Sequence, residues 1–224
     1  MQAVILAAGE GVRMRPLTLT TPKPLIKVAG VPILEHVVQA LPDEIDEIIL
    51  VVRYLSEQVK EYCGDSFCGK RVVYVEQGPK KGTAAALAYA RPYIKGRFLI
   101  TFADDLLAKK DLEELIKHEH ATLVTIHENP QNFGVVSLNK DGTLCTIVEK
   151  PEHPETNLIS TGVSVLSPKI FDYKPEEKKG ELFMTGMITG LAKDFPVAVV
   201  RASFWQPVGY PEHIPLAEAA LIQK

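Results

Sequence analysis

The chain has 224 residues, of which 46% are hydrophobic, 24% charged and 7% aromatic, a composition typical of a globular protein with one sizeable core. Lysine and arginine number 25 against 28 acidic residues, which gives a net charge of −3. A mildly acidic chain has no general affinity for the nucleic-acid backbone or for anionic membranes, so we expect neither as a partner.

Strand-like and helix-like segments alternate through the first half of the chain. Short apolar runs, typical of strands buried on both faces, stand between amphipathic or alanine-rich segments. The predicted strands are 4–8, 48–52, 71–75, 98–102 and 122–127, and the predicted helices are 32–41, 55–62, 83–89 and 112–120. This alternation predicts a largely parallel sheet with helices on both faces.

The pattern changes after Gly134. Short segments that flank the turn at Asp141–Gly142 are typical of antiparallel strands, whereas the charged run at 174–179 indicates a solvated loop. The elements predicted for this half are strands at 135–138, 144–149, 162–166 and 197–200 and helices at 183–193 and 214–222. We therefore predict a single α/β domain over 1–224, a three-layer sandwich on a Rossmann-like, mixed and mainly parallel sheet with an antiparallel portion.

A glycine-rich loop follows the first predicted strand. Gly9 and Gly11 let the backbone approach a ligand closely, so that successive N–H groups can cradle phosphate oxygens. Arg13 and Lys23 add the positive charge that suits a triphosphate. On its own, Gly9-x-Gly11 is better explained as a turn after a strand, because short glycine motifs match by chance. The Walker loop and the Rossmann fingerprint do not fit, since the Lys-Ser/Thr ending and the third glycine are absent.

The longer string is more specific. Residues 6–18 read LAAGEGVRMRPLT and residues 22–25 read PKPL, which resembles the sugar-1-phosphate nucleotidylyltransferase signature Gly-x-Gly-x-Arg-Met/Leu-x-Pro-Leu-Thr followed by Pro-Lys-Pro. The resemblance implies transfer of a nucleotidyl group from a nucleoside triphosphate to a sugar 1-phosphate, release of pyrophosphate, and Mg²⁺ as cofactor. It assigns nucleotide binding or catalysis to Leu6, Ala8, Gly9, Gly11, Arg13 and Lys23, the last steadying the α-phosphate.

Two further motifs concern the base and the metal. Residues 76–84 read EQGPKKGTA and stand where the family reads the base. The amide of Gln77 offers one donor and one acceptor, which suits uracil or thymine. The resemblance makes Gln77 the residue that recognises the base and Gly82 the residue that leaves room for it, which favours UTP or dTTP over GTP. The alternative is that Gln77 is an ordinary glutamine in a surface loop.

Asp104 follows the strand at 98–102, at the edge where open parallel sheets bind ligands, and it matches the family's magnesium-binding aspartate. The alternative is an aspartate that caps a turn.

Motifs for the sugar phosphate follow in the second half. Residues 132–136 resemble a Tyr-Gly-Val motif whose glycine, here Gly134, lies against the sugar. Glu149-Lys150-Pro151 matches a motif in which the glutamate contacts sugar hydroxyls and the lysine contacts the sugar phosphate, and Thr161 falls where relatives have Asn-Ala-Gly or Val-Thr-Gly. On their own, Glu149 and Lys150 would be a solvated ion pair on a sheet edge. By this resemblance, 1–130 binds mainly the nucleotide and 131–224, with the antiparallel portion, mainly the sugar phosphate.

Two positions depart from the family pattern. Pro207 stands where Trp-x-Asp-Val/Ile-Gly has its second metal-binding aspartate, and Gly186 replaces the aspartate of Gly-Glu-x-x-x-Thr-Asp. Asp104 would then hold Mg²⁺ with water and phosphate oxygens, helped by Asp105 or Gln206. Two alternatives stay open: a nucleotide-sugar-binding regulatory subunit or sensor with weakened catalysis, and a guanylyl- or cytidylyltransferase.

The remaining features concern the compartment and the partners. Three cysteines at loose spacing form no disulfide framework, and the first apolar run lacks a basic segment and is too short to cross a bilayer. We expect a cytoplasmic protein whose partners are a nucleoside triphosphate and a sugar 1-phosphate. The sequence leaves open the choice of sugar, the choice between UTP and dTTP, and the oligomeric state, a homo-oligomer included.

Overall fold

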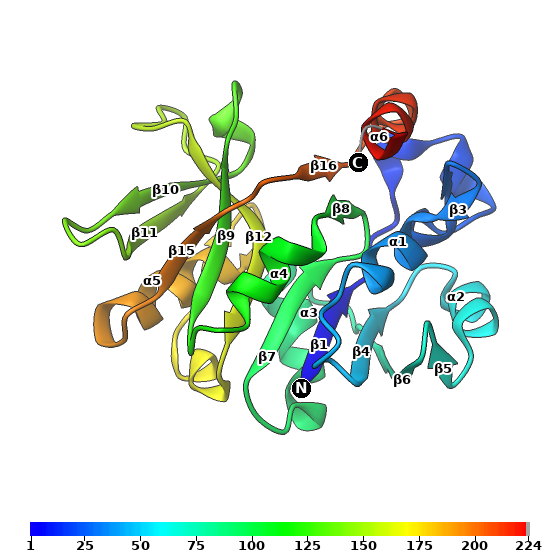
Figure 1. Ribbon diagram of the computed structural model, residues 1–224, viewed down its shortest axis with the longest axis horizontal. Helices are drawn as coiled ribbons and strands as arrows, with labels where there is room; N and C mark the ends of the chain where they lie inside the picture. The colour runs from blue at the N-terminus through cyan, green and yellow to red at the C-terminus, as the bar shows by residue number, and fades with distance from the viewer. Residues whose placement is uncertain (223–224) are drawn as a thin grey trace.

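A ten-stranded mixed sheet forms the centre of the computed structural model, which describes residues 1–222 (Figure 1). Its parallel part consists of β1 (Gln2–Leu6), β4 (Glu47–Val52), β6 (Lys70–Glu76) and β7 (Phe98–Phe102). β1 lies between β4 and β7, and β6 pairs with the outer side of β4. The four strands predicted for this part are therefore confirmed, with ends within two residues of the expected ones.

Helices cover both faces of the sheet. Successive residues of a strand point to opposite faces, and β1 follows this rule: Ala3 and Ile5 pack into one apolar cluster, whereas Val4 and Leu6 pack into the other. The first cluster contains α1 (Ile33–Gln39), α2 (Ser56–Cys63), α4 (Lys109–Leu115) and α6 (His213–Ile222), and the second contains α3 (Thr83–Ala90) and α5 (Met184–Asp194). This arrangement confirms the three-layer, Rossmann-like α/β fold class.

An antiparallel group extends the sheet beyond β7. The long strand β12 (Leu158–Leu166) pairs with β7 along its second half and also with β9 (Ala121–Ile126) and β10 (Gly134–Leu138). β11 (Leu144–Glu149) then pairs with β10, and β15 (Ala198–Arg201) runs parallel to β9. Because β12 joins both groups, strands from the two halves of the chain share one sheet (Figure 1).

Two sequence predictions are wrong. The helix predicted for 112–120 begins earlier and ends at Leu115, because the chain then turns, with His118 N–H bonded to the Leu115 carbonyl oxygen, and enters β9. The charged run at 174–179 is not a solvated loop: Glu176–Lys178 is strand β13, paired with β14 (Glu181–Phe183). Several short elements have no sequence prediction, including β2 (Lys27–Val28), β3 (Val31–Pro32), β5 (Ser66–Phe67), β8 (Asp105–Leu107) and β16 (Trp205–Pro207).

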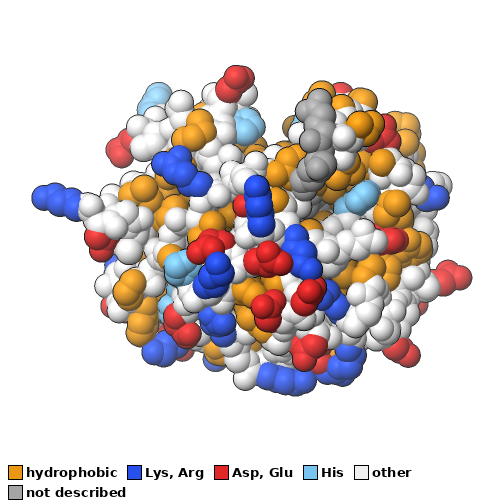
Figure 2. Space-filling view, in the orientation of Figure 1, with side chains coloured by type: hydrophobic (Ala, Val, Ile, Leu, Met, Phe, Trp, Pro, Cys, Tyr) orange, Lys and Arg blue, Asp and Glu red, His pale blue; other side chains and the backbone are white. Residues whose placement is uncertain are grey.

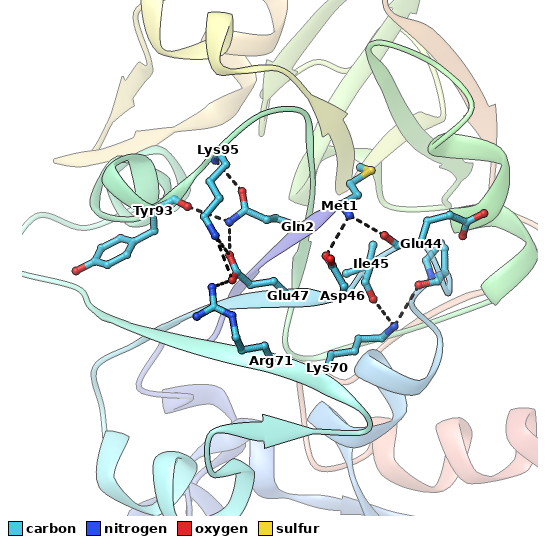
Figure 3. A network of polar contacts seen from close by, with 11 residues as sticks. Met1, Gln2, Glu44, Ile45, Asp46, Glu47, Lys70, Arg71, Tyr93 and Lys95 are labelled. Atoms are coloured by element: carbon cyan, nitrogen blue, oxygen red, sulfur yellow. Dashed lines mark hydrogen bonds and ion pairs between the residues drawn. The ribbon is translucent and has the colours of Figure 1, made fainter.

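A polar network closes the amino-terminal edge of the parallel strands (Figure 3). The buried carboxylate of Glu47 forms ion pairs with Arg71 and Lys95 and accepts a hydrogen bond from the Gln2 amide. Gln2, Glu47 and Arg71 are also register partners on three adjacent strands. The network therefore fixes the strands at the edge opposite to their carboxyl ends.

Charges on the surface are mixed in sign. On the face shown in Figure 2, basic and acidic side chains are interspersed with apolar ones and form no extended basic patch. The upper outline of that view is notched between the end of β9 and α6. Within residues 1–222, no helix is long and apolar enough to span a bilayer.

Candidate active site

A cavity of about 410 Å³ opens at the carboxyl ends of the parallel strands. The loop after each strand contributes to its wall, as does the amino end of α3, because parallel strands bring their carboxyl ends to one edge of a sheet. Its lining includes the predicted site residues Leu6, Ala8, Gly9, Lys23, Gln77, Gly82 and Asp104. Seven residues selected from separate sequence motifs therefore meet around one space.

The glycine loop after β1 uses its two glycines differently. A side-chain carbon added to Gly9 would meet nothing within 4 Å, so this backbone is open toward the cavity that it lines. Gly11 does not line the cavity, and it has a positive φ of 62°. A carbon added there would lie 2.9 Å from Thr18 Cγ2 and 3.2 Å from Lys23 Cβ. Gly9 thus leaves room for a ligand, and Gly11 lets the loop fold onto itself.

Lys23 and Asp104 form an ion pair in the cavity wall. Their side chains are 11% and 31% exposed, so the pair is largely shielded from solvent. Lys23 lies in the short 3₁₀-helix η3 (Lys23–Leu25), and Asp104 follows β7. An ammonium group and a carboxylate together at this position can bind a phosphate oxygen and a cation, respectively.

Asp105, next in the chain, points elsewhere. Its carboxylate is buried and accepts a hydrogen bond of 3.0 Å from Trp205 Nε1. Burial, and then the charge of Asp104, raises the pKa of Asp105 above its ordinary value, although Trp205 and Lys23 oppose the shift. Asp105 was a candidate for helping to hold a cation. Its hydrogen bond to the indole of Trp205 does not favour that role.

The departure at Pro207 lies beside these carboxylates. β16 pairs antiparallel with β8 so that Pro207 is opposite Asp105, and Val208 N–H bonds to the Asp104 carbonyl oxygen at 2.9 Å. The amide of Gln206 donates to the Pro207 carbonyl oxygen at 3.1 Å. No group of three potential His, Cys, Asp or Glu ligands occurs within residues 1–222. Asp104 at the cavity still fits Mg²⁺, which is commonly held by one or two carboxylates and otherwise by water and phosphate oxygens.

The base-binding candidates lie on the opposite wall. Gln77 follows β6, and its Nε2 donates to the Lys80 carbonyl oxygen at 2.7 Å, which fixes the side chain while its second N–H stays available. Gly82 has a φ of 100°, and a side-chain carbon added to it would collide with the Leu182 backbone. Close packing against Leu182 is thus a second reason for glycine at this position, besides the room for a base that the sequence analysis assigns to it.

Arg13 lies outside the cavity lining. Its guanidinium stacks over the ring of Tyr210 at 5.0 Å from the ring centroid. Tyr210 follows the Trp205–Pro207 strand, so the arginine of the glycine loop contacts the segment that carries the family's second metal position. Arg13 is exposed, and only the tertiary structure pairs it with this aromatic ring.

The sugar-phosphate candidates form a neighbouring cluster on β10 to β12. Gly134 pairs with Glu149 in register, and a side-chain carbon on it would lie 3.7 Å from Glu149 Oε2. Glu149 is buried, and this burial raises the pKa of its carboxyl against the opposing effect of Lys150. The Lys150 ammonium lies 3.5 Å from Glu149 Oε1 and 5.0 Å from the ring centroid of Phe183, which lines the cavity. The cluster therefore adjoins the nucleotide cavity through Phe183.

Thr161 occupies the interior of this cluster. Its side chain is buried, and its hydroxyl donates to the Leu123 carbonyl oxygen at 3.0 Å and accepts from Val163 N–H at 3.3 Å. The hydroxyl is thus engaged with the backbone of the sheet. A contact between this residue and a sugar would come from its main chain.

Several residues that line the cavity are not among the predicted site residues, including Arg53, Lys81, Glu181 and Phe183. Arg53 directly follows β4, so the strand-end argument applied to Asp104 could have found it. Glu181 and Phe183 belong to β14, next to the charged run that was predicted as a loop.

Glycine at position 186, where the family has aspartate, has a steric cause, because a side-chain carbon there would collide with the Glu176 backbone. The Glu176 carboxylate accepts a hydrogen bond from Thr185 at 3.2 Å, so a carboxylate is still present in this region.

The chain is similar in sequence to known nucleotidyl transferases. A sequence model described as nucleotidyl transferase matches residues 2–224. The chain is 37% identical over 228 residues to the bifunctional protein GlmU of Methanocaldococcus jannaschii, covering 100% of this chain and 55% of that protein. It is 32% identical over 235 residues to UTP–glucose-1-phosphate uridylyltransferase AglF of Haloferax volcanii, covering 99% and 96%. The chain thus spans about half the length of GlmU and nearly all of AglF.

Two solved structures resemble the chain closely. A putative glucose-1-phosphate thymidylyltransferase from Bacillus anthracis, in complex with sucrose, superimposes with a TM-score of 0.87 at 26% identity, covering 98% of this chain and 94% of that one. A UDP-glucose pyrophosphorylase complexed with UDP-glucose superimposes with a TM-score of 0.84, covering 99% and 98%. At 21% identity the second likeness concerns the fold alone.

Proposed function

The chain belongs to the nucleotidyl transferase family, and from this premise we propose that it is a sugar-1-phosphate nucleotidylyltransferase. It would join the nucleotidyl group of UTP or dTTP to a sugar 1-phosphate and release pyrophosphate. The observation that carries the proposal is the Lys23–Asp104 ion pair, which lines the same cavity as the open backbone of Gly9. A phosphate-binding loop, a shielded cation and a carboxylate are the groups that nucleotidyl transfer requires.

Gln77 supports a pyrimidine nucleotide with a carbonyl at position 4. The side-chain amide is held at the cavity wall by its bond to Lys80 and keeps a donor and an acceptor for a base edge. Two of the similar proteins are named as a uridylyltransferase and a thymidylyltransferase. Both observations favour UTP or dTTP over GTP and CTP.

Gly134, Glu149, Lys150 and Thr161 support a sugar phosphate as the acceptor. The buried Glu149 carboxylate is a strong acceptor for sugar hydroxyls. Lys150 is half exposed and reaches the edge of the cavity beside Phe183, where a cation can bind the acceptor's phosphate. In this proposal the nucleotide binds beside Gln77 and Gly82, and the acceptor binds beside Glu149 and Lys150.

In the proposed reaction, an oxygen of the sugar phosphate attacks the α-phosphorus in line. A new P–O bond forms, the bond from the α-phosphorus to the oxygen that bridges to the β-phosphate breaks, and pyrophosphate leaves with the electron pair. The protein has little covalent work to do, so positioning and charge neutralisation supply the catalysis. Lys23 binds the α-phosphate, and Lys150 holds the attacking phosphate. Arg13 lies outside the cavity lining, so we assign it to the more distant β- and γ-phosphates, which leave as pyrophosphate.

Members of this family generally use a divalent metal ion, and we propose Mg²⁺ here. Asp104 would hold the ion, since it follows β7 and lies beside Lys23 in the cavity wall, whereas Asp105 is bonded to Trp205. When bound, Mg²⁺ neutralises phosphate charge that Lys23 alone does not. The ion pair with Lys23 places the Asp104 carboxylate at the cavity wall, where the ion would bind.

The proposal is tested by pyrophosphate release from UTP, dTTP, GTP and CTP, each with a panel of sugar 1-phosphates and millimolar Mg²⁺. Release with a uridine or thymidine nucleotide is expected. Release with GTP or CTP alone would overturn the assignment of the base. Nucleotide-sugar binding without release at any metal concentration would instead indicate a binding subunit or sensor, in keeping with the loss of the aspartate at Pro207.

A further inference from the structure

The hairpin of β13 and β14, residues 176–183, contacts both walls of the site. On the nucleotide side, Leu182 N–H donates to the Lys81 carbonyl oxygen at 3.0 Å, beside Gly82. On the acceptor side, the Lys178 ammonium donates to the carbonyl oxygens of Glu149 and Lys150 at 3.0 and 2.6 Å. This hairpin thus joins the base-binding loop to the sugar-phosphate motif.

The backbone that Lys178 holds has an unusual conformation. Lys150 has a φ of 43°, in the left-handed region that residues with a side chain rarely adopt. Lys150 N–H bonds to the Phe133 carbonyl oxygen at 2.9 Å, which fixes one side of the turn. The other side is fixed by two carbonyl oxygens that converge on one ammonium group. Such charge-assisted hydrogen bonds are stronger than neutral ones.

We propose that Lys178 is a positioning residue, which holds the Glu149–Lys150 turn so that the Lys150 ammonium faces the acceptor's phosphate. The inference rests on the proposed function for the role of Lys150. Lys178 acts through the backbone of the turn and not on the substrate, because two of its three N–H donors are used by carbonyl oxygens of that turn. Without this ammonium, the strained turn relaxes and the Lys150 side chain moves from its place beside Phe183.

The first test replaces Lys178 by a side chain of similar length without donors, Lys178→Met. Loss of hydrogen bonds to a charged donor should lower kcat/KM for the sugar phosphate about tenfold and leave the KM for the nucleotide unchanged. Lys178→Arg keeps a donor and should recover most of the loss. Lys174→Met is the matched control, because it removes the same charge from an exposed position on the same segment and should leave both substrates unaffected.

The second test does not depend on activity. Amide hydrogen exchange in a peptide covering residues 146–152 reports the Lys150 N–H, which should exchange faster in Lys178→Met but not in Lys174→Met. Unchanged exchange and an unchanged acceptor KM would overturn the inference, as would an equal loss for both substrates, which would indicate a general structural role. If the unmodified protein transfers no nucleotide at all, the proposed function fails, and the exchange measurement alone decides whether Lys178 holds the turn.

Discussion

Lys23 and Asp104 are 81 residues apart in the sequence, and their side chains form an ion pair in the wall of the cavity that Gly9 borders. The pair brings the glycine loop together with the carboxyl end of β7. Because both side chains are largely shielded from water, each charge depends on the other until a phosphate or a metal ion replaces it. Removing one member should therefore lower activity, and it should also cost some stability because the partner's charge is left without its counter-charge.

Lys23→Ala should lower turnover about 10²- to 10³-fold, the effect typical of removing one pre-oriented charge from a transition state. The protein should remain folded, because Lys23 lies in the short 3₁₀-helix η3 at the cavity wall and not in the apolar core. Pyrophosphate release and a thermal melt check both parts. Lys27→Ala, an exposed lysine on the neighbouring β2, is the control. Turnover close to normal in Lys23→Ala would contradict the assigned role.

The two glycines of the loop should respond differently to alanine. Gly9→Ala places its new carbon in open space, so stability should be unchanged while nucleotide affinity falls. Gly11→Ala meets Thr18 and Lys23 at a positive φ and should lower the free energy of unfolding by about 1 kcal/mol or more. Denaturant unfolding and nucleotide titration separate these effects. Equal destabilisation by both changes would refute the distinction.

Pro207→Asp restores the family's second carboxylate opposite Asp105. We expect half-maximal activity at a several-fold lower Mg²⁺ concentration, because a second oxygen ligand strengthens binding of a hard cation. Without metal the variant should be less stable, since three carboxylates then lie close together. Pro207→Asn is the uncharged control. An unchanged metal requirement would show that position 207 does not reach the ion.

Glu47→Gln tests the network at the amino-terminal edge (Figure 3). Glu47 is 7% exposed, accepts a hydrogen bond from Gln2 and forms ion pairs with Arg71 and Lys95. The change should therefore lower the free energy of unfolding by about 2 kcal/mol. Activity should persist, because the network lies at the edge opposite to the cavity. Glu57→Gln, which breaks an exposed ion pair with Lys60, is the control and should have little effect. A selective loss of activity in Glu47→Gln would contradict this placement.

His120 should make stability fall at mildly acidic pH. Burial lowers its pKa below the ordinary value of 6.5, so the folded state holds the neutral ring, whose Nε2 bonds to Ser167. The unfolded chain binds a proton more readily, and this stabilisation is therefore lost as pH falls from about 6.5 through the folded-state pKa. Urea midpoints at pH 7 and pH 5 should differ less in His120→Gln. Identical pH slopes would assign the effect to other groups.

The sequence alone predicts the main elements and several of the residues that line the cavity. The runs at 48–52 and 98–102 are apolar throughout, and a strand buried on both faces needs only that local property. Gly9, Lys23 and Asp104 were selected because their residue types and order resemble a family signature, and the fold gathers them because parallel strands end at one edge.

The pairing of distant segments depends on tertiary contacts that the local sequence does not record. The charged run at 174–179 has the composition of a loop, and Glu176–Lys178 becomes a strand because β14 pairs with it and the Lys178 ammonium finds two carbonyl oxygens. The end of α4 at Leu115, the bond from Trp205 to Asp105 and the engaged hydroxyl of Thr161 also depend on partners far away in the chain. Periodicity and composition record the preferences of neighbouring residues, whereas these contacts form only after long loops have closed.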